Sequence, residues 1–128
     1  MRPTLSIIAN WMQGSALSSG GDRIFIELGK RWTSRLSIKL FVSQDGWKIC
    51  QREGLGNFDH EIWALNRLNK YGYIINYLYR TFISFRKALQ LKIDEKAIVY
   101  STSDFWPDSI PAFILKLRSP EVKWIAGF

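Results

Sequence analysis

Residues 18–22, with the order Ser-Ser-Gly-Gly-Asp, form the first segment whose residue types could bind a ligand. The paired Gly20 and Gly21 let the backbone approach a bound group closely, because they carry no Cβ atom. A segment with helical periodicity follows, and the free N–H groups at a helix N-terminus favour anions. The segment therefore suits phosphate or a sugar oxyanion. A Gly-rich turn that binds nothing explains the same residues equally well.

Residues 101–108 form the second candidate, between a short apolar run and another segment with helical periodicity. Asp104 or Asp108 could accept hydrogen bonds from sugar hydroxyls, and Trp106 could stack on the face of a sugar ring. In the alternative interpretation, Ser103 and Asp104 cap the helix that follows. Capping explains these residue types without any ligand.

The sequence contains one histidine and one cysteine. His60 lies between two carboxylates, an arrangement that could orient a general base. No nucleophile or metal ligand lies at a spacing that completes such a site, so the sequence favours a structural role for His60 at the surface or at a strand edge. Cys50 has no disulfide partner, which favours a reducing compartment and a half-buried thiol. The carboxylates show no metal-ligand spacing, and we expect no metal site.

Two common nucleotide-binding patterns are absent from the glycine-rich segment. Its spacing differs from the Gly-x-Gly-x-x-Gly pattern of dinucleotide-binding proteins, and no Gly-Lys-Ser/Thr ending marks a P-loop. These differences count against a dehydrogenase and against a P-loop NTPase.

The composition is that of a folded protein with an anionic partner. Hydrophobic residues make up 47% and charged residues 23%, which is ordinary for a globular domain. The net charge of +7 suggests nucleic acid, a phosphorylated substrate or anionic lipid as partner, although the basic residues are dispersed. The apolar run at the start is too short for a signal peptide, and no stretch approaches the roughly 18 apolar residues of a membrane span. We therefore expect a soluble or peripheral protein of the cytoplasm.

Apolar runs and amphipathic segments alternate along the chain. This alternation predicts an α/β fold, a Rossmann-like three-layer sandwich with a mostly parallel sheet of about five or six strands. The predicted strands are 5–9, which should be central, 36–42, 58–65, 97–100 and 122–128. The predicted helices are 22–32, 71–92 and 106–117, with a short helix or loop at 44–51. The loops after Asn10 and after Tyr100 should lie at the carboxyl edge of the sheet, where such folds bind ligands.

The predicted helices carry stripes of apolar residues, which is typical of helices that face a core. In 71–92 the stripe is Ile74, Leu78, Phe82, Phe85 and Leu89; in 106–117 it is Ile110, Phe113, Ile114 and Leu117. Asp22 could serve the N-terminus of the first helix, and Pro111 could mark the first turn of the last one.

Basic residues of 71–92 lie away from its apolar stripe. Arg80, Arg86 and Lys87, with Tyr77 and Tyr79 nearby, could hold the domain against anionic headgroups. A solvated helix face is the alternative, since the charges do not form a block.

Three segments together resemble the N-terminal half of the family 4 glycosyltransferases of the GT-B type. They are residues 7–12 with 19–23, residues 100–104 with Asp108, Pro111 and Ala112, and residues 120–126. The resemblance covers nearly all of the sequence in order. It implies two Rossmann-like domains facing a cleft, of which 1–128 is the N-terminal, acceptor-side domain, with the C-terminal donor-binding domain absent.

The resemblance also implies roles for four residues. Gly20 and Gly21 would contact phosphates of a nucleotide-sugar donor or of the acceptor, and Ser103 and Asp104 would line the acceptor side. Many relatives place a histidine where this sequence has Gly127, so no catalytic residue is assigned.

The expected function is sugar transfer from a nucleotide sugar, which is a substrate and not a cofactor, to an unknown acceptor. We expect residues 1–128 to be inactive alone and the enzyme to have no nucleic-acid partner. Peripheral contact with the inner membrane surface stays an open alternative. The other hypothesis is a non-catalytic, basic Rossmann-like module that binds nucleotide or nucleic acid.

Overall fold

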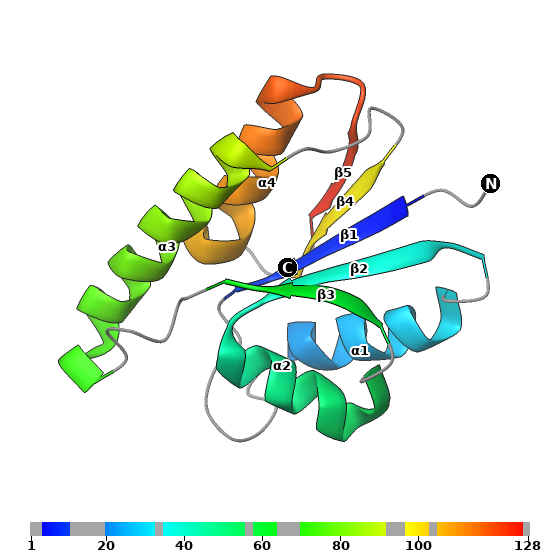
Figure 1. The fold of residues 1–128 in the computed structure, drawn as a ribbon, viewed down its shortest axis with the longest axis horizontal. Helices are drawn as coiled ribbons and strands as arrows, with labels where there is room; N and C mark the ends of the chain where they lie inside the picture. Colours follow the sequence, from blue (N-terminus) through cyan, green and yellow to red (C-terminus); the bar gives the residue numbers. More distant parts are fainter. Residues whose placement is uncertain are drawn as a thin grey trace.

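The strands of the chain pair in parallel throughout the described sheet (Figure 1). The structure is a computed structural model that describes residues 4–10, 20–32, 35–55, 58–63, 70–91, 97–102 and 105–126. The sheet order is β3-β2-β1-β4-β5. The strands are β1 (Thr4–Ala9), β2 (Ser37–Val42), β3 (Asp59–Ile62), β4 (Ile98–Ser101) and β5 (Lys123–Ala126). The predicted α/β, Rossmann-like sandwich and the central place of the first strand are confirmed.

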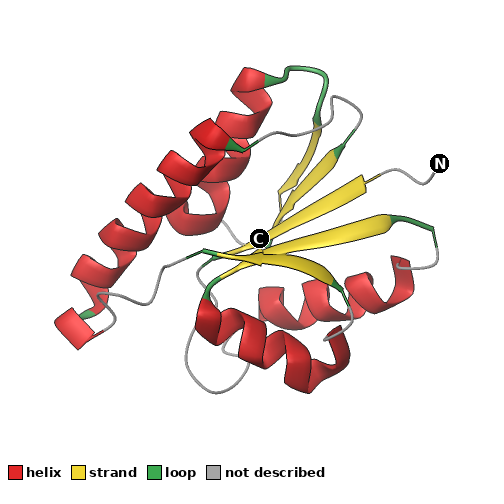
Figure 2. Cartoon of the chain, viewed as in Figure 1, coloured by secondary structure: helices red, strands yellow, loops and turns green. Residues whose placement is uncertain are grey.

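Helices cover both faces of the sheet (Figures 1 and 2). One face carries α1 (Gly20–Trp32) and α2 (Gln44–Cys50), and α2 continues as a π-helical turn, η1 (Gln51–Leu55). The other face carries α3 (Tyr73–Gln90) and α4 (Trp106–Arg118). Each crossover helix runs back along the sheet, so its N-terminus lies toward the carboxyl edge of the strands. None of the described helices has the length and apolar character that crossing a bilayer requires.

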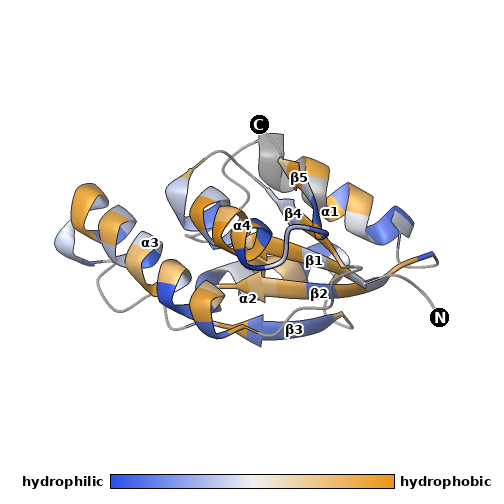
Figure 3. Cartoon of the chain, turned by 90° about the horizontal axis from the view of Figure 1, so that it is seen from above, coloured by the Kyte–Doolittle hydropathy of each residue, from blue (hydrophilic) through white to orange (hydrophobic). Residues whose placement is uncertain are grey.

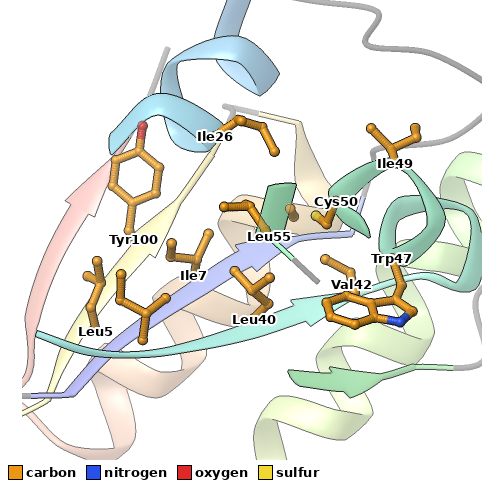
Figure 4. Packing of buried hydrophobic residues seen from close by; sticks show 12 residues of the cluster. Leu5, Ile7, Ile26, Leu40, Val42, Trp47, Ile49, Cys50, Leu55 and Tyr100 are labelled. Atoms are coloured by element: carbon orange, nitrogen blue, oxygen red, sulfur yellow. The ribbon is translucent and has the colours of Figure 1, made fainter. Parts of the chain in front are cut away.

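The central strand is apolar because it is covered from both sides. Leu5 and Ile7 belong to a core cluster under α1 and α2, whereas Ile8 belongs to a second cluster under α3 and α4. Figure 4 shows side chains of the strands, such as Leu40, facing Ile26 and other residues of the helical layer. Successive strand residues point to opposite faces, so a strand with two cores carries apolar residues toward both faces, and in β1 only Ser6 interrupts the run from Leu5 to Ala9.

Several predicted boundaries were wrong. The first helix begins at Gly20, which places Asp22 inside its first turn. The short helix is longer than predicted and includes η1, in which Gly54 adopts a φ of 97° that favours glycine. The third strand is shorter, Asp59–Ile62, and its side chains are mostly exposed. Cys50 is fully buried in the first core cluster and not half-buried.

The apolar stripe of α3 does not face the core, contrary to the prediction. Its members are 38–71% exposed: Ile74, Leu78, Phe82, Phe85 and Leu89. The buried row of α3 is instead Asn76, Arg80, Ser84 and Ala88. The cause is tertiary, because Asn10 at the carboxyl edge of the sheet binds Arg80 and Ser84 of the polar row. Figure 3 shows apolar residues along much of α3, at the margin of the molecule.

Helix α4 packs over β1, β4 and β5 through Ala112 and Leu115. Of its predicted stripe, Phe113 and Leu117 are exposed, at 48% and 60%. Pro107 lies in the first turn, as expected, but Pro111 lies inside the helix and not at its start. A proline inside a helix leaves the carbonyl four residues earlier without its usual donor. That carbonyl belongs to Pro107 and accepts a hydrogen bond from Asn10 Nδ2 at 3.0 Å.

The phenol of Tyr100 in β4 makes stability depend on alkaline pH. Tyr100 is 5% exposed, and burial raises its pKa above the ordinary value of 10.0. The folded state holds this proton more tightly than the unfolded chain does. The contribution of Tyr100 to stability is therefore complete below pH 10 and is lost as the pH rises through the raised pKa.

We therefore expect the native protein to lose more free energy of unfolding above pH 10 than the Tyr100→Phe variant loses. Urea denaturation followed by circular dichroism, at neutral and at alkaline pH, measures the difference. Equal losses in the two proteins would show that Tyr100 titrates as it does in the unfolded chain.

Candidate functional site

The strand order reverses between β1 and β4, which makes their carboxyl ends the topological switch point of the sheet. Ile8 of β1 is in register with Ser101 of β4. Thr102, just beyond β4, donates its N–H to Ile8 O at 3.2 Å. The segments that follow β1 and β4 therefore begin side by side, as the sequence predicted. We call the carboxyl ends of β1 and β4, with Asn10 and Thr102, the switch-point edge.

Asp108, in the first turn of α4, joins the two strand ends. Its side chain is buried, with 1% exposure. Asn10 donates its backbone N–H to Asp108 Oδ1 in a short hydrogen bond. The Thr102 hydroxyl lies 3.3 Å from Asp108 Oδ2 and 3.2 Å from Ile8 O, so two acceptors share its proton. Asp108 therefore holds the backbone together and is not available to sugar hydroxyls, in contrast to the role considered from the sequence.

Arg80 reaches the switch-point edge from α3 and is fully buried. Its Nη1 donates to Asn10 O at 2.7 Å, and its Nε donates to Asn76 Oδ1 at 3.1 Å. Its Nη2 lies 4.0 Å from Asp45 Oδ2, just past the end of β2. Burial lowers the pKa of Arg80 to about 10, and the charges of Asp45 and Asp108 oppose this shift. Arg80 is therefore a cation at neutral pH that binds the protein's own groups.

Asn10, directly after β1, has the only described buried side-chain atom without a hydrogen-bond partner. The side chain is 0% exposed. Its Nδ2 donates to Ser84 Oγ at 2.9 Å and to Pro107 O at 3.0 Å. The carbonyl of Pro107 can only accept, so this contact identifies the amide nitrogen. Asn10 Oδ1 has no partner, and a buried acceptor of this kind is suited to a hydroxyl or N–H donor of a ligand.

Gly20 and Gly21 are the first two residues of α1, the helix that follows β1. The N–H groups in the first turn of a helix have no partner within the helix, and the helix dipole makes this end positive. The structure therefore gives the glycine pair the position that the phosphate-binding hypothesis needs. It also shows that Asp22 is the third helical residue and not the N-cap.

The other two predicted site residues, Ser103 and Asp104, lie outside the described residues. The structure does bear on the alternative that they cap the next helix. The N-cap of α4 is Phe105, whose own side chain makes no capping hydrogen bond. That interpretation was therefore wrong for the N-cap position itself.

Aromatic side chains lie where α4 begins. Tyr77 contacts Trp106 and Phe105, with ring centroids 5.7 Å and 6.3 Å away, and Tyr73 stacks on Tyr77 at 6.0 Å. Trp106 is 51% exposed, so its ring can stack on a sugar face, as considered from the sequence.

The N-terminus of α4 has few free donors. The backbone N–H of Trp106 donates to the Tyr77 hydroxyl at 2.9 Å. Pro107 has no N–H, and the backbone N–H of Asp108 bonds to Phe105 O at 3.0 Å. The N-terminus of α4 therefore offers few free donors to an anion, in contrast to that of α1.

His60 is not part of this site. It lies on the edge strand β3, stacks on Trp47 with ring centroids 3.6 Å apart, and has Nδ1 3.2 Å from Phe58 O. The expected position at a strand edge is confirmed. Across the described ranges, no group of three His, Cys, Asp or Glu residues could hold a metal ion.

The described residues of the switch-point edge do not assemble a catalytic dyad. Sequence reasoning missed the buried polar network on which this edge depends. One signal was available, because Asn76, Arg80 and Ser84 repeat at every fourth position and so share one face of a helix. The apolar stripe of the same helix was the stronger pattern and was followed instead.

Comparisons with protein-family models, with curated proteins and with solved structures gave no match, so the fold and the geometry of the switch-point edge carry the functional argument.

Proposed function

We propose that the chain is the acceptor-side, Rossmann-like domain of a glycosyltransferase, an enzyme that transfers a sugar from a nucleotide sugar to an acceptor. One observation carries the proposal. At the switch point of a parallel sheet, α1 begins with Gly20-Gly21 after β1, and β1 ends in Asn10 with a buried acceptor oxygen that has no partner. The helix N-terminus suits a phosphate, and the amide oxygen suits a hydroxyl group.

The chemistry of sugar transfer fits such an edge. The bond to the diphosphate breaks as the sugar moves, and negative charge grows on the leaving phosphate. Backbone N–H groups at a helix N-terminus stabilise that charge without a proton transfer. The exposed ring of Trp106 offers a flat apolar surface to a sugar. Positioning donor and acceptor together requires a second wall opposite the edge, which the resemblance assigns to a second Rossmann-like domain.

A substitution at the start of α1 tests phosphate binding. Gly21→Asp places a carboxylate where the phosphate would lie, while acidic residues in a first turn favour the helix itself. We expect affinity for uridine diphosphate, measured by calorimetry, to fall about tenfold or more through repulsion of like charge.

Gln44→Asp, which adds the same charge at the first residue of α2, is the matched control. It should leave the affinity unchanged. If both variants bind equally well or equally poorly, the phosphate does not lie at α1. The reaction itself is tested by a screen of nucleotide sugars against the full-length protein, following release of the nucleoside diphosphate.

The non-catalytic alternative rests on the net charge of +7 and on the absence of a catalytic dyad among the described residues. It predicts that single-stranded oligonucleotides compete with uridine diphosphate, with an affinity that falls steeply with salt. The glycosyltransferase proposal predicts no such competition.

A further inference from the structure

The exposed apolar row of α3 takes no part in the candidate site. Its five residues, Ile74, Leu78, Phe82, Phe85 and Leu89, are spaced by three and four positions. At about 3.6 residues per turn they share one side of the helix. The buried row, from Asn76 to Ala88, occupies nearly the opposite side. The row therefore points away from α4 and the sheet, along a helix at the margin of the molecule (Figures 1 and 3).

The orientation of this row follows from the switch-point edge. Arg80 binds Asn10 O and Asn76, and Ser84 accepts from Asn10 Nδ2. These contacts hold the polar side of α3 inward, so the apolar side must face outward. An exposed apolar row of this length on a folded domain is typical of a surface that another body covers.

The charges of the layer formed by α3 and α4 indicate which kind of partner covers the row. Helix α3 contains no Asp or Glu, and the only carboxylate of α4 is the buried Asp108. The basic residues of the two helices, apart from the buried Arg80, are Arg86, Lys87, Lys116 and Arg118. The opposite layer, α1 with α2 and η1, mixes both signs. The α3–α4 layer thus joins exposed apolar side chains with charge of one sign.

Arg86 shows how the two features combine. Its guanidinium carbon lies 5.9 Å from the centre of the Phe82 ring, so its aliphatic chain runs along the apolar row. Long basic side chains of this kind leave their charge at the boundary between an apolar phase and water. Two aromatic residues near the start of α3, Tyr71 and Tyr73, are 54% and 62% exposed. Tyrosine favours the interface between a bilayer and water.

We propose that the apolar row of α3, with Arg86, docks the protein on the surface of an anionic lipid bilayer. The helix lies in the plane of the interface, its apolar row sinks among the acyl chains, and Arg86 meets anionic headgroups. The residues differ from those expected from the sequence, because Arg80 is buried and plays no part. The proposal stands on this surface alone and does not depend on the reaction at the switch-point edge.

Vesicle flotation tests the proposal with the full chain. We expect binding to phosphatidylcholine vesicles that contain phosphatidylglycerol and little binding to pure phosphatidylcholine, with release by added salt. Loss of one basic contact corresponds to about a fivefold change in affinity. Arg86→Glu reverses one charge and so changes it by two units, which should therefore weaken binding about 25-fold or more. Leu78→Gln with Phe82→Gln should also weaken it strongly, while circular dichroism stays native because both side chains are exposed.

Matched controls lie on the opposite layer. Arg31→Glu with Lys48→Glu reverses two exposed charges there, and Ile24→Gln replaces an apolar residue of α1 that is 51% exposed. These variants should bind anionic vesicles nearly as the native chain does. Equal binding to neutral and anionic vesicles, or equal losses in both sets of variants, would overturn the proposal. The proposal would also be overturned if the α3 variants bound vesicles as the native chain does, while sedimentation showed a dimer for the native chain and monomers for the variants. The row would then be an interface between two copies.

Discussion

Replacing Asp108 by alanine is expected to destabilise the fold by about 3–5 kcal/mol, the range observed when one member of a buried charge pair is removed. The variant loses the acceptors of the Asn10 N–H and of the Thr102 hydroxyl. Arg80 keeps Asp45, 4.0 Å away, but loses the negative charge of Asp108, which opposes the lowering of its pKa. Urea denaturation followed by circular dichroism measures the free energy of unfolding.

Two further variants separate the causes. In Asp108→Asn, the amide oxygen can still accept from Asn10 and the amide nitrogen can donate to Thr102, so mainly the charge is lost. We expect a cost of about 1–2 kcal/mol, the difference between charged and neutral hydrogen bonds. Glu121→Ala removes an exposed carboxylate and should change stability by about 0.5 kcal/mol at most. A loss for Asp108→Ala no greater than that for Glu121→Ala would contradict the central place of Asp108.

Arg80→Met is expected to destabilise the fold by about 3 kcal/mol, the net result of two opposing effects. The lowered pKa of Arg80 shows that burying the cation costs free energy, and methionine removes that cost. The same change leaves Asn10 O and Asn76 Oδ1 without the donors that Arg80 supplies, and it removes the positive charge that interacts with Asp45 and Asp108. Each buried orphan costs about 1–3 kcal/mol, so the second effect exceeds the first.

The matched control is Arg86→Met on the same helix. Arg86 is exposed, and its loss should cost about 0.5 kcal/mol or less. In a double-mutant cycle, Arg80→Met with Asp108→Asn should cost at least about 1 kcal/mol less than the sum of the single variants, because the two side chains share one network. Additive losses would mean that Arg80 and Asp108 do not stabilise each other.

The network connects stability to the proposed function. Asn10, Asp108 and Arg80 fix the backbone directly after β1, where the chain continues toward α1. Their contacts satisfy the buried groups of this edge except for Asn10 Oδ1. A rigid edge with one buried acceptor that has no partner, and with an exposed aromatic ring at the start of α4, is suited to the polar ligand that we propose. Ligand binding should therefore depend on the same residues that hold the sheet and α4 together.

The fold class could be predicted from the sequence because it depends on local patterns. The run from Leu5 to Ala9 is apolar except for Ser6, which is typical of a strand covered on both faces. The alternation of such runs with amphipathic segments restricts the chain to parallel strands with helical crossovers. The same reasoning placed the segments after Asn10 and Tyr100 at one edge. The position of His60 at a strand edge also followed from the sequence.

Tertiary structure alone decided which side of α3 is buried. The apolar row and the row of Asn76, Arg80 and Ser84 both repeat with the period of a helix, so periodicity cannot choose between them. The choice depends on Asn10, which is 70 residues from Arg80 and 74 from Ser84, and which also binds Asp108 across 98 residues. Hydrogen bonds between residues so far apart leave no local pattern in the sequence. They satisfy buried polar groups at the switch-point edge, and in doing so they leave the apolar row of α3 exposed.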